Sequence, residues 1–199
     1  VALRPHYKVL DVCAGTNSVG IRLLKKLPGI SVTAIDRSKE MQEQGTSDAQ
    51  KAGLHIDSVI HDVLDLPFPD NTFPDNSFDV ITLQAASRHL QLDKALPEIY
   101  RVLKPGGWFY HCDMLKPTNR TLEWLYLRYL RVSLYLTAVI FGSSQDSRNC
   151  GGYFVDAIHH FYTPEELSGI LNLIGFTQVT GKKSIWGGMV GFHSAQKPL

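Results

Sequence analysis

The 199-residue sequence has few cysteines, little net charge and no long uncharged apolar run. Its three cysteines, Cys13, Cys112 and Cys150, form no C-x-x-C pair, which argues against a disulfide framework or a thiolate zinc site and favours a reducing, cytoplasmic location. We expect no metal. The formal net charge of +1 gives the whole chain no electrostatic footprint for nucleic acid. No stretch reaches about 18 uncharged apolar residues, so we expect no membrane-spanning helix, and the first residues lack the apolar core of a signal peptide.

The residues that are present alternate between strand and helix patterns. Residues 8–12 read as a short buried strand, and apolar residues at Val19, Leu23 and Leu27 give the following run helical spacing. Further strands are predicted at 31–35, 55–60, 79–84, 108–112, 176–182 and 188–194, and further helices at 38–52, 92–103, 121–141 and 163–174. This order predicts a single α/β domain over residues 1–199. Its fold would be a Rossmann-like, doubly wound, mostly parallel seven-stranded sheet, with helices on both faces and an antiparallel strand at one edge.

Several segments carry local signals of their own. Thr163, Pro164 and Glu166 have the spacing of a capping box at a helix start. Residues 143–152 are polar and rich in glycine, so we predict a loop there. The duplicated pentads 69–73 and 74–78 have Pro-Asp-Asn turn chemistry and predict an exposed, lengthened loop. The apolar-aromatic run 121–141 suits burial against the sheet, a channel for a lipid tail, or a dimer seam.

The first strand leads into a small-residue turn at 13–17 and then into a helix. Turn amides and a helix N-terminus together suit a polar or anionic ligand. Asp36 ends the second predicted strand about 20 residues later, where folds of this class hold a ribose through carboxylate hydrogen bonds. The alternative is that Asp36 only caps the next helix. The turn lacks G-x-G-x-x-G, which argues against a dinucleotide.

From about residue 9 to 197 the chain resembles the class I S-adenosylmethionine-dependent methyltransferases, and within them the ubiquinone/menaquinone biosynthesis C-methyltransferases. The motifs of the wider group are Leu10-Asp11-Val12, Ile35-Asp36, and segments 66–71, 77–79 and 101–107. More specific to the quinone group are Arg88, Asp113 followed by Lys116-Pro117, and segments 153–160 and 188–194.

The resemblance implies S-adenosylmethionine as cofactor, with S-adenosylhomocysteine as product. The implied cofactor contacts are Asp11, Cys13, Ala14, Gly15, Thr16, Asn17, Asp36, Arg37, Met41, Asp62, Val63 and Gln84. Asp36 would bind the ribose hydroxyls, and Asp62 the adenine amino group unless it only caps its loop. The family usually has three alternating glycines in the turn, where this chain has Cys13, Gly15 and Asn17. Asparagine tolerates a left-handed backbone, whereas Cys13 either narrows the pocket or packs as a small hydrophobe.

The resemblance also implies the reaction, a methyl transfer to a ring carbon of a prenylated benzoquinol or naphthoquinol. Arg88 would hold the developing phenolate, unless it is a surface or ion-paired residue. A histidine would be the base, with Asp113 to orient it. The implied catalytic set is Arg88, His89, Asp113 and His159, with His111 and His160 as further candidates for the base. The family commonly has Asn at position 89 and Arg at 159, and each histidine could equally be a packed residue.

Two other functions are left open by the sequence. One is O- or N-methylation of a different small molecule, and the other is a non-catalytic nucleotide-binding domain. The family carries a helical segment before the first strand that closes over the pocket, whereas this sequence begins almost at that strand. We therefore expect residues 114–162 to cover the substrate. The lipophilic substrate and the run 121–141 leave open both peripheral membrane association and a homodimer.

Overall fold

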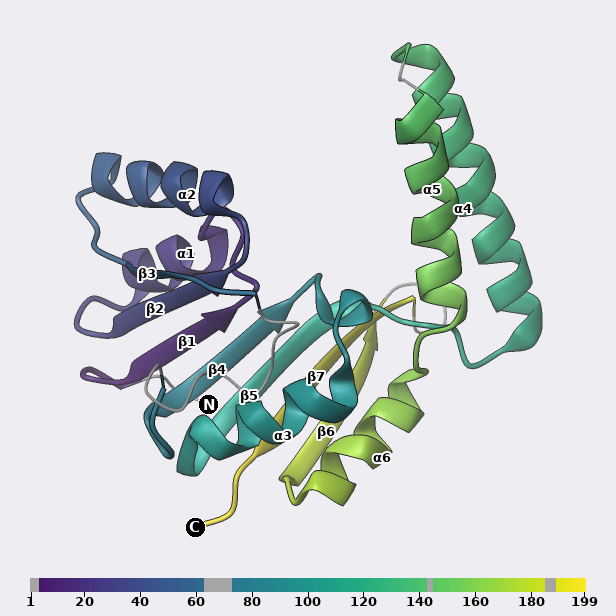
Figure 1. The fold of residues 1–199 in the computed structure, drawn as a ribbon. Coiled ribbons are helices and arrows are strands. Elements are labelled where there is room, and N and C mark those ends of the chain that lie inside the picture. The colour runs from purple at the N-terminus through teal and green to yellow at the C-terminus, as the bar shows by residue number, and fades with distance from the viewer. Residues whose placement is uncertain (1–3, 63–72, 143–144, 185–188) are drawn as a thin grey trace.

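The computed structural model describes residues 4–62, 73–142, 145–184 and 189–199, and these form one mixed sheet with helices around it (Figure 1). The strands are β1 (Lys8–Val12), β2 (Ser31–Asp36), β3 (Asp57–Ile60), β4 (Phe78–Gln84), β5 (Leu103–Met114), β6 (Thr177–Ser184) and β7 (Val190–Gln196). The helices are α1 (Ser18–Lys26), α2 (Lys39–Lys51), α3 (Leu92–Val102), α4 (Arg120–Ile140), α5 (Gln145–His159) and α6 (Pro164–Ile174), with a short 3-10 helix η1 (Ser87–His89).

The seven strands lie in the order β3-β2-β1-β4-β5-β7-β6. β1 pairs in parallel with both β2 and β4, so the strand order reverses between β1 and β4. β7 is antiparallel to both β5 and β6, which places the antiparallel pairing at one edge. The predicted doubly wound, seven-stranded fold is confirmed. In such a sheet, ligands bind at the carboxyl ends of the strands beside the point of reversal.

Apolar side chains cover both faces of the sheet. Neighbouring residues of a strand point to opposite faces, and Val9 and Leu10 of β1 accordingly belong to different clusters. The cluster with Leu10 packs against α3 and α6, and the cluster with Val9 packs against α1 and α2. Helices therefore cover both faces of the sheet, as predicted.

α4 and α5 form an antiparallel pair that projects beyond the ends of the parallel strands (Figure 1). The prediction of a loop over 143–152 is wrong from Gln145 onward, because α5 begins there; residues 143–144 lie outside the described part. Glycine and short polar residues give this segment a poor intrinsic helix propensity. Packing overrides it, because α5 pairs with α4 along its length.

Several predicted boundaries are confirmed and others shift. Thr163 and Glu166 form the capping box, with the Thr163 amide donating to Glu166 Oε2 over 2.8 Å. α3 ends at Val102 and β5 begins at once, so residues 104–107 lie within a strand rather than before one. Residues 63–72, with much of the first pentad, lie outside the described residues. In the second pentad region only the tip is exposed, because the Phe73 and Phe78 rings pack edge to face in the core.

Candidate functional site

A cleft of about 720 Å³ lies at the carboxyl ends of β1, β2 and β4, beside the point where the strand order reverses. Its wall contains nine of the predicted cofactor contacts: Asp11, Cys13, Ala14, Gly15, Asp36, Arg37, Met41, Asp62 and Gln84. Thr16 and Asn17 are not part of the wall, and Val63 lies outside the described residues. Volumes of 300–1,000 Å³ are usual for sites that enclose small molecules and cofactors.

The turn between β1 and α1 adopts a left-handed backbone at each of three alternating positions. Cys13, Gly15 and Asn17 have φ of 56°, 53° and 58°. A left-handed backbone costs a non-glycine residue about 1–2 kcal/mol, less for asparagine. Gln42 of α2 compensates by donating to the Gly15 carbonyl and to Asn17 Oδ1, both over 2.9 Å. Asn17 is thus held from behind the turn and keeps the turn shape without glycine.

Gly45 in the middle of α2 allows that helix to pack closely against the turn. A Cβ at position 45 would lie 2.6 Å from the Thr16 carbonyl carbon, which no real side chain tolerates. The sequence shows only a glycine that weakens a helix. The structure shows that the missing side chain of Gly45 leaves room for the backbone of the turn. Gln42 and Gly45 therefore support the shape of the turn, and sequence reasoning missed both.

Asp36 joins the turn to the start of α2. Its Oδ2 accepts from the Gly15 amide over 2.8 Å, and its Oδ1 accepts from the Ser38 amide over 2.9 Å. The N-cap of α2 is Ser38, whose hydroxyl accepts from the Met41 amide. Each carboxylate oxygen has a second acceptor position, so Asp36 can receive two ligand hydroxyls and still fix the turn.

Asp11 is 2% exposed and only half satisfied. Thr82 Oγ1 donates to its Oδ1 over 2.6 Å, whereas Oδ2 has no hydrogen-bond partner among the described residues. Burial raises the pKa of Asp11 to about 6, outweighing the Thr82 hydrogen bond, and the nearby Asp36 charge adds to the rise. Burial likewise raises the pKa of the Cys13 thiol to about 12, which keeps it protonated and unreactive at neutral pH.

Of the predicted catalytic residues only His89 belongs to the wall of this cleft. Arg88, its neighbour in η1, lies in the wall of another cleft of about 520 Å³, and the two clefts share Tyr153 and Leu90. Arg88 forms an ion pair with Asp113, which is 2% exposed and also accepts from the Met114 amide over 2.7 Å. His89 belongs to the cleft wall together with Tyr153 of α5. The two rings stack with centroids 5.7 Å apart, and His89 Nδ1 lies 3.1 Å from the Tyr153 hydroxyl. Burial, and then the Arg88 charge, lower the pKa of His89, which favours its neutral form.

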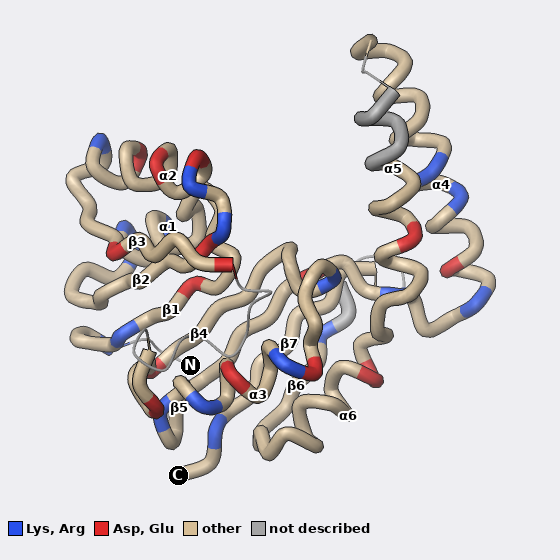
Figure 2. Tube along the Cα trace, in the orientation of Figure 1, with Lys and Arg blue, Asp and Glu red and all other residues tan. Residues whose placement is uncertain are grey.

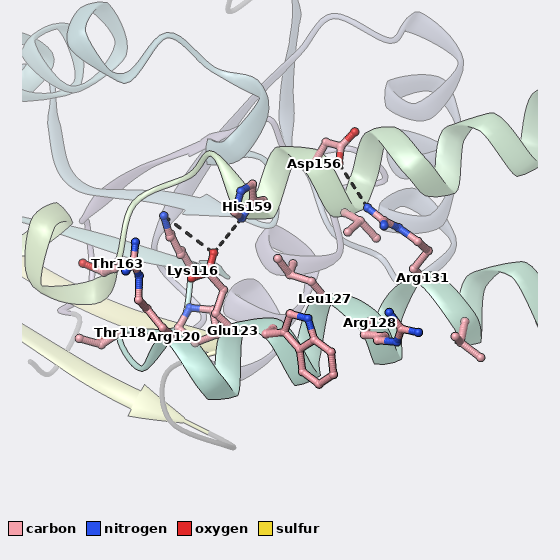
Figure 3. Close-up of a pocket in the computed structure, with 14 residues that line it drawn as sticks. Lys116, Thr118, Arg120, Glu123, Leu127, Arg128, Arg131, Asp156, His159 and Thr163 are labelled. Carbon is pink, nitrogen blue, oxygen red and sulfur yellow. Dashed lines mark hydrogen bonds and ion pairs between the residues drawn. The ribbon is translucent and has the colours of Figure 1, made fainter.

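His159 lies in a different cleft, of about 830 Å³, between α4 and α5 (Figure 3). Its Nδ1 is 2.8 Å from Glu123 Oε1, which Lys116 Nζ approaches to 3.8 Å. His159 is therefore not part of the wall that holds His89, and its catalytic role stays a prediction. His160, the residue after α5, bonds the Asp156 carbonyl and lies in the same cleft wall as Arg88, and His111 is buried. No group of three metal-ligating side chains occurs among the described residues.

Comparisons with known proteins agree with this geometry. Residues 1–197 match the model of the ubiE/COQ5 methyltransferase family. The chain is 32% identical over 200 residues to the ubiquinone/menaquinone biosynthesis C-methyltransferase UbiE of Cereibacter sphaeroides, covering 99% of this chain and 76% of that protein. It is 34% identical over 198 residues to the demethylmenaquinone methyltransferase of Corynebacterium kroppenstedtii, covering 98% and 78%.

Solved structures share the fold at lower identity. Phosphoethanolamine N-methyltransferase 2 of Haemonchus contortus, in complex with S-adenosyl-L-methionine, superposes with a TM-score of 0.73 at 15% identity. That match covers all of this chain, which spans 50% of the other. A methyltransferase of Aquifex aeolicus that depends on the same donor gives 0.64 at 21% identity, covering 98% and 85%. The chain thus belongs to the ubiE/COQ5 methyltransferase family, and it is an enzyme that uses S-adenosylmethionine as its methyl donor.

Proposed function

We propose that this enzyme methylates a ring carbon of a prenylated benzoquinol or naphthoquinol. The observation that carries the proposal is the Arg88–Asp113 pair, whose arginine directly precedes His89 of the cleft that fits the methyl donor and lies in an adjoining cleft. A guanidinium fixed by a carboxylate can bind a phenolate oxygen without reorganising during the reaction. The named activities of the UbiE and demethylmenaquinone relatives support the same substrate class for this chain.

Different residues of the cleft bind different parts of the methyl donor. The unpaired Oδ2 of Asp11 fits the ammonium of the methionine moiety, because a buried carboxylate oxygen without a partner is costly until a cation binds it. Asp36 receives the ribose hydroxyls, and Asp62 lies where the adenine amino group would reach it. When bound, S-adenosylmethionine supplies an electrophilic methyl group on a sulfonium. Gln84 and Ala85, at the end of β4, lie in the cleft wall where the methyl group and the ring would meet.

The remaining residues act on the quinol. In the tautomer whose Nδ1 donates to the Tyr153 hydroxyl, His89 keeps a lone pair on Nε2 that can accept the quinol hydroxyl proton. Arg88 then holds the phenolate oxygen while the ring carbon forms its bond to the methyl and the sulfonium–methyl bond breaks. The ring proton would then pass to water and His89 would return its proton to the oxygen, which restores the aromatic quinol. Because sulfonium and phenolate charges cancel, alignment and exclusion of water contribute most of the acceleration.

α4 and α5 carry the apolar surfaces that a lipophilic substrate or a lipid surface would contact. We treat residues 1–199 as a single domain in which 114–162 cover the substrate, and the place of Tyr153 in the cleft wall supports that role. The exposed apolar residues of α4 recur at alternating spacings of four and three: Leu125, Tyr129, Val132, Leu136 and Val139. Such spacing makes one continuous apolar stripe along a helix.

Charge favours an anionic lipid surface as the partner of this stripe. Beyond Glu123, the charged residues of α4 are Arg128 and Arg131 (Figure 2). No helix in the described part of the chain is long and apolar enough to cross a bilayer. We propose that the stripe binds the membrane surface peripherally. The scarcity of cysteine favours the cytoplasmic side. We expect wild type to sediment with phosphatidylglycerol vesicles and Tyr129→Asp to remain in the supernatant. Self-association abolished by Tyr129→Asp, without vesicle binding, would instead assign the stripe to a homodimer.

The reaction is tested by mass spectrometry with deuterated-methyl S-adenosylmethionine and a panel of short-prenyl quinols. We expect a product that keeps the label on a ring carbon. Label on oxygen or nitrogen would move the enzyme to another class of methyl acceptor, and binding of the donor without any product would favour a non-catalytic domain.

A further inference from the structure

Behind the Arg88–Asp113 pair lies a row of buried polar side chains that the proposed reaction does not use. It consists of Ser87 of η1, His111 of β5 and His193 of β7, each at most 3% exposed. Such groups are costly to bury unless their hydrogen bonds are complete. Their arrangement therefore requires an account of each proton.

The row makes four consecutive contacts between two fixed ends. Ser87 Oγ lies 2.6 Å from Asp113 Oδ2 and 2.8 Å from His111 Nε2. His111 Nδ1 lies 3.4 Å from His193 Nδ1, and His193 Nε2 lies 3.0 Å from the Pro164 carbonyl oxygen. The ends, a carboxylate and a carbonyl, can only accept.

Counting hydrogens shows that the neutral row is one proton short. Four contacts need four hydrogens, whereas one hydroxyl and two neutral imidazoles supply three. With His193 Nε2 donating to Pro164, Ser87 donating to Asp113 and His111 Nε2 donating to Ser87, only the contact between the two Nδ1 atoms lacks a hydrogen. That contact is the longest of the four, as expected where two lone pairs face each other.

We propose that the two facing Nδ1 atoms of His111 and His193 bind one shared proton, and that Ser87, His111 and His193 are positioning residues for Arg88. With that proton in place all four contacts are hydrogen bonds, and Asp113 is fixed from behind while it holds Arg88 in front. The positioning role rests on the proposed function of Arg88, whereas the proton-binding site does not.

The groups around the two rings set the pH range in which the proton binds. Asp113 on β5 and Glu165 on α6 favour the protonated state, and burial opposes it. Arg88 on η1 and Lys182 on β6 are the cations on the neighbouring elements. Burial and the neighbouring ring lower the pKa of His111 to about 4, so the site is empty at neutral pH and fills in acid. A small cavity of about 290 Å³, with both histidines in its wall, gives the proton a way in.

Nitrogen-15 NMR of the imidazoles tests the proton site without any quinol. At pH 8 we expect both Nδ1 atoms to be unprotonated, and on acidification we expect the two rings to titrate together with uptake of one proton. In His193→Phe two effects oppose each other: loss of the facing acceptor lowers the His111 midpoint, and loss of the neighbouring ring's charge raises it. A shared proton predicts that the first effect is the larger and that the midpoint falls, whereas a rise would show repulsion between the rings without a shared proton. His55→Asn, which changes an exposed histidine paired with Asp57, is the matched control and should leave the midpoint in place.

Two titration results would overturn the proton site. One is a proton on Nδ1 of His111 at pH 8, and the other is independent titration of the two rings with an unchanged or raised His111 midpoint in His193→Phe. If His193→Phe does not fold, the wild-type titration alone decides, because a shared proton requires one common midpoint.

Kinetics of Ser87 variants test the positioning role. Ser87→Ala should lower kcat about tenfold or more while the KM for S-adenosylmethionine is retained, and Ser87→Thr, which keeps the hydroxyl, should recover much of the rate. An unchanged kcat in Ser87→Ala would overturn the role. Wild type that methylates no quinol would refute the proposed function instead, and the titration would still decide the proton site.

Discussion

Asp11→Asn should raise the free energy of unfolding of the protein and weaken its binding of S-adenosylmethionine. Burial raises the Asp11 pKa from 3.8 to about 6, a difference of roughly 2 units or about 3 kcal/mol. The folded state therefore binds more protons than the unfolded state between these pH values. Its free energy of unfolding must fall as pH rises through this window. Asparagine keeps the acceptor for Thr82 and carries no charge, so the variant should be more stable than wild type at pH 7, by up to about 3 kcal/mol.

Urea unfolding without ligand at pH 4, 5, 6 and 7 measures this effect. The stability difference between Asp11→Asn and wild type should be small at pH 4 and grow toward pH 7, and Asp57→Asn, an exposed acid on β3, should show no such growth. Calorimetry should find S-adenosylmethionine binding weakened about tenfold or more, because a charge-assisted hydrogen bond contributes about 1.5–3 kcal/mol. Wild-type affinity should also rise with pH up to about 6 as Asp11 ionises. A difference independent of pH, or unchanged affinity, would refute the reasoning.

Three further substitutions test the cleft and the catalytic pair. Asp36→Ala removes the proposed ribose acceptors and the partner of the Gly15 amide. Calorimetry should show S-adenosylmethionine binding weakened about tenfold or more, with Asp36→Asn intermediate. Unchanged affinity in both variants would contradict the assignment of Asp36 to the ribose. Cys13→Gly relieves a left-handed residue and should raise the free energy of unfolding by about 1 kcal/mol in urea, whereas a decrease would show that the thiol's packing outweighs its backbone strain. Arg88→Ala should lower kcat while the affinity for S-adenosylmethionine stays the same. Arg88→Lys should recover only part of the rate, because an ammonium cannot reproduce the planar guanidinium. A loss of donor affinity as large as the loss of kcat would place Arg88 in the cofactor site.

Most of the fold could be predicted from periodicity, because burial on both faces leaves short apolar strands between amphipathic helices. Val9, Leu10 and Val12 show this in β1, and the capping box at Thr163 gave the start of α6. α5 could not be predicted in full. Its first turns have no apolar periodicity of their own, and the helix pairs there with α4, which is a tertiary effect.

The cofactor cleft was predictable because parallel strands bring their carboxyl ends to one edge. Asp11 and Asp36 lie at the carboxyl ends of β1 and β2, and the turn follows β1 directly, so their proximity follows from the sheet alone. The row behind Arg88 was not predictable as a unit. His111 and His193 lie 82 residues apart and meet only because β7 pairs antiparallel to β5 in one particular register. His159 shows the opposite case, a motif position that the fold places in another cleft.

The central claim is tested most directly by comparing a reduced short-prenyl quinol with its oxidised quinone, using carbon-13-methyl S-adenosylmethionine and NMR of the product. We predict that the quinol gains the labelled methyl on a ring carbon and that the quinone does not react, because only the quinol can form the electron-rich phenolate that Arg88 holds. Methylation of the quinone at the same rate, or label on oxygen, would contradict the account.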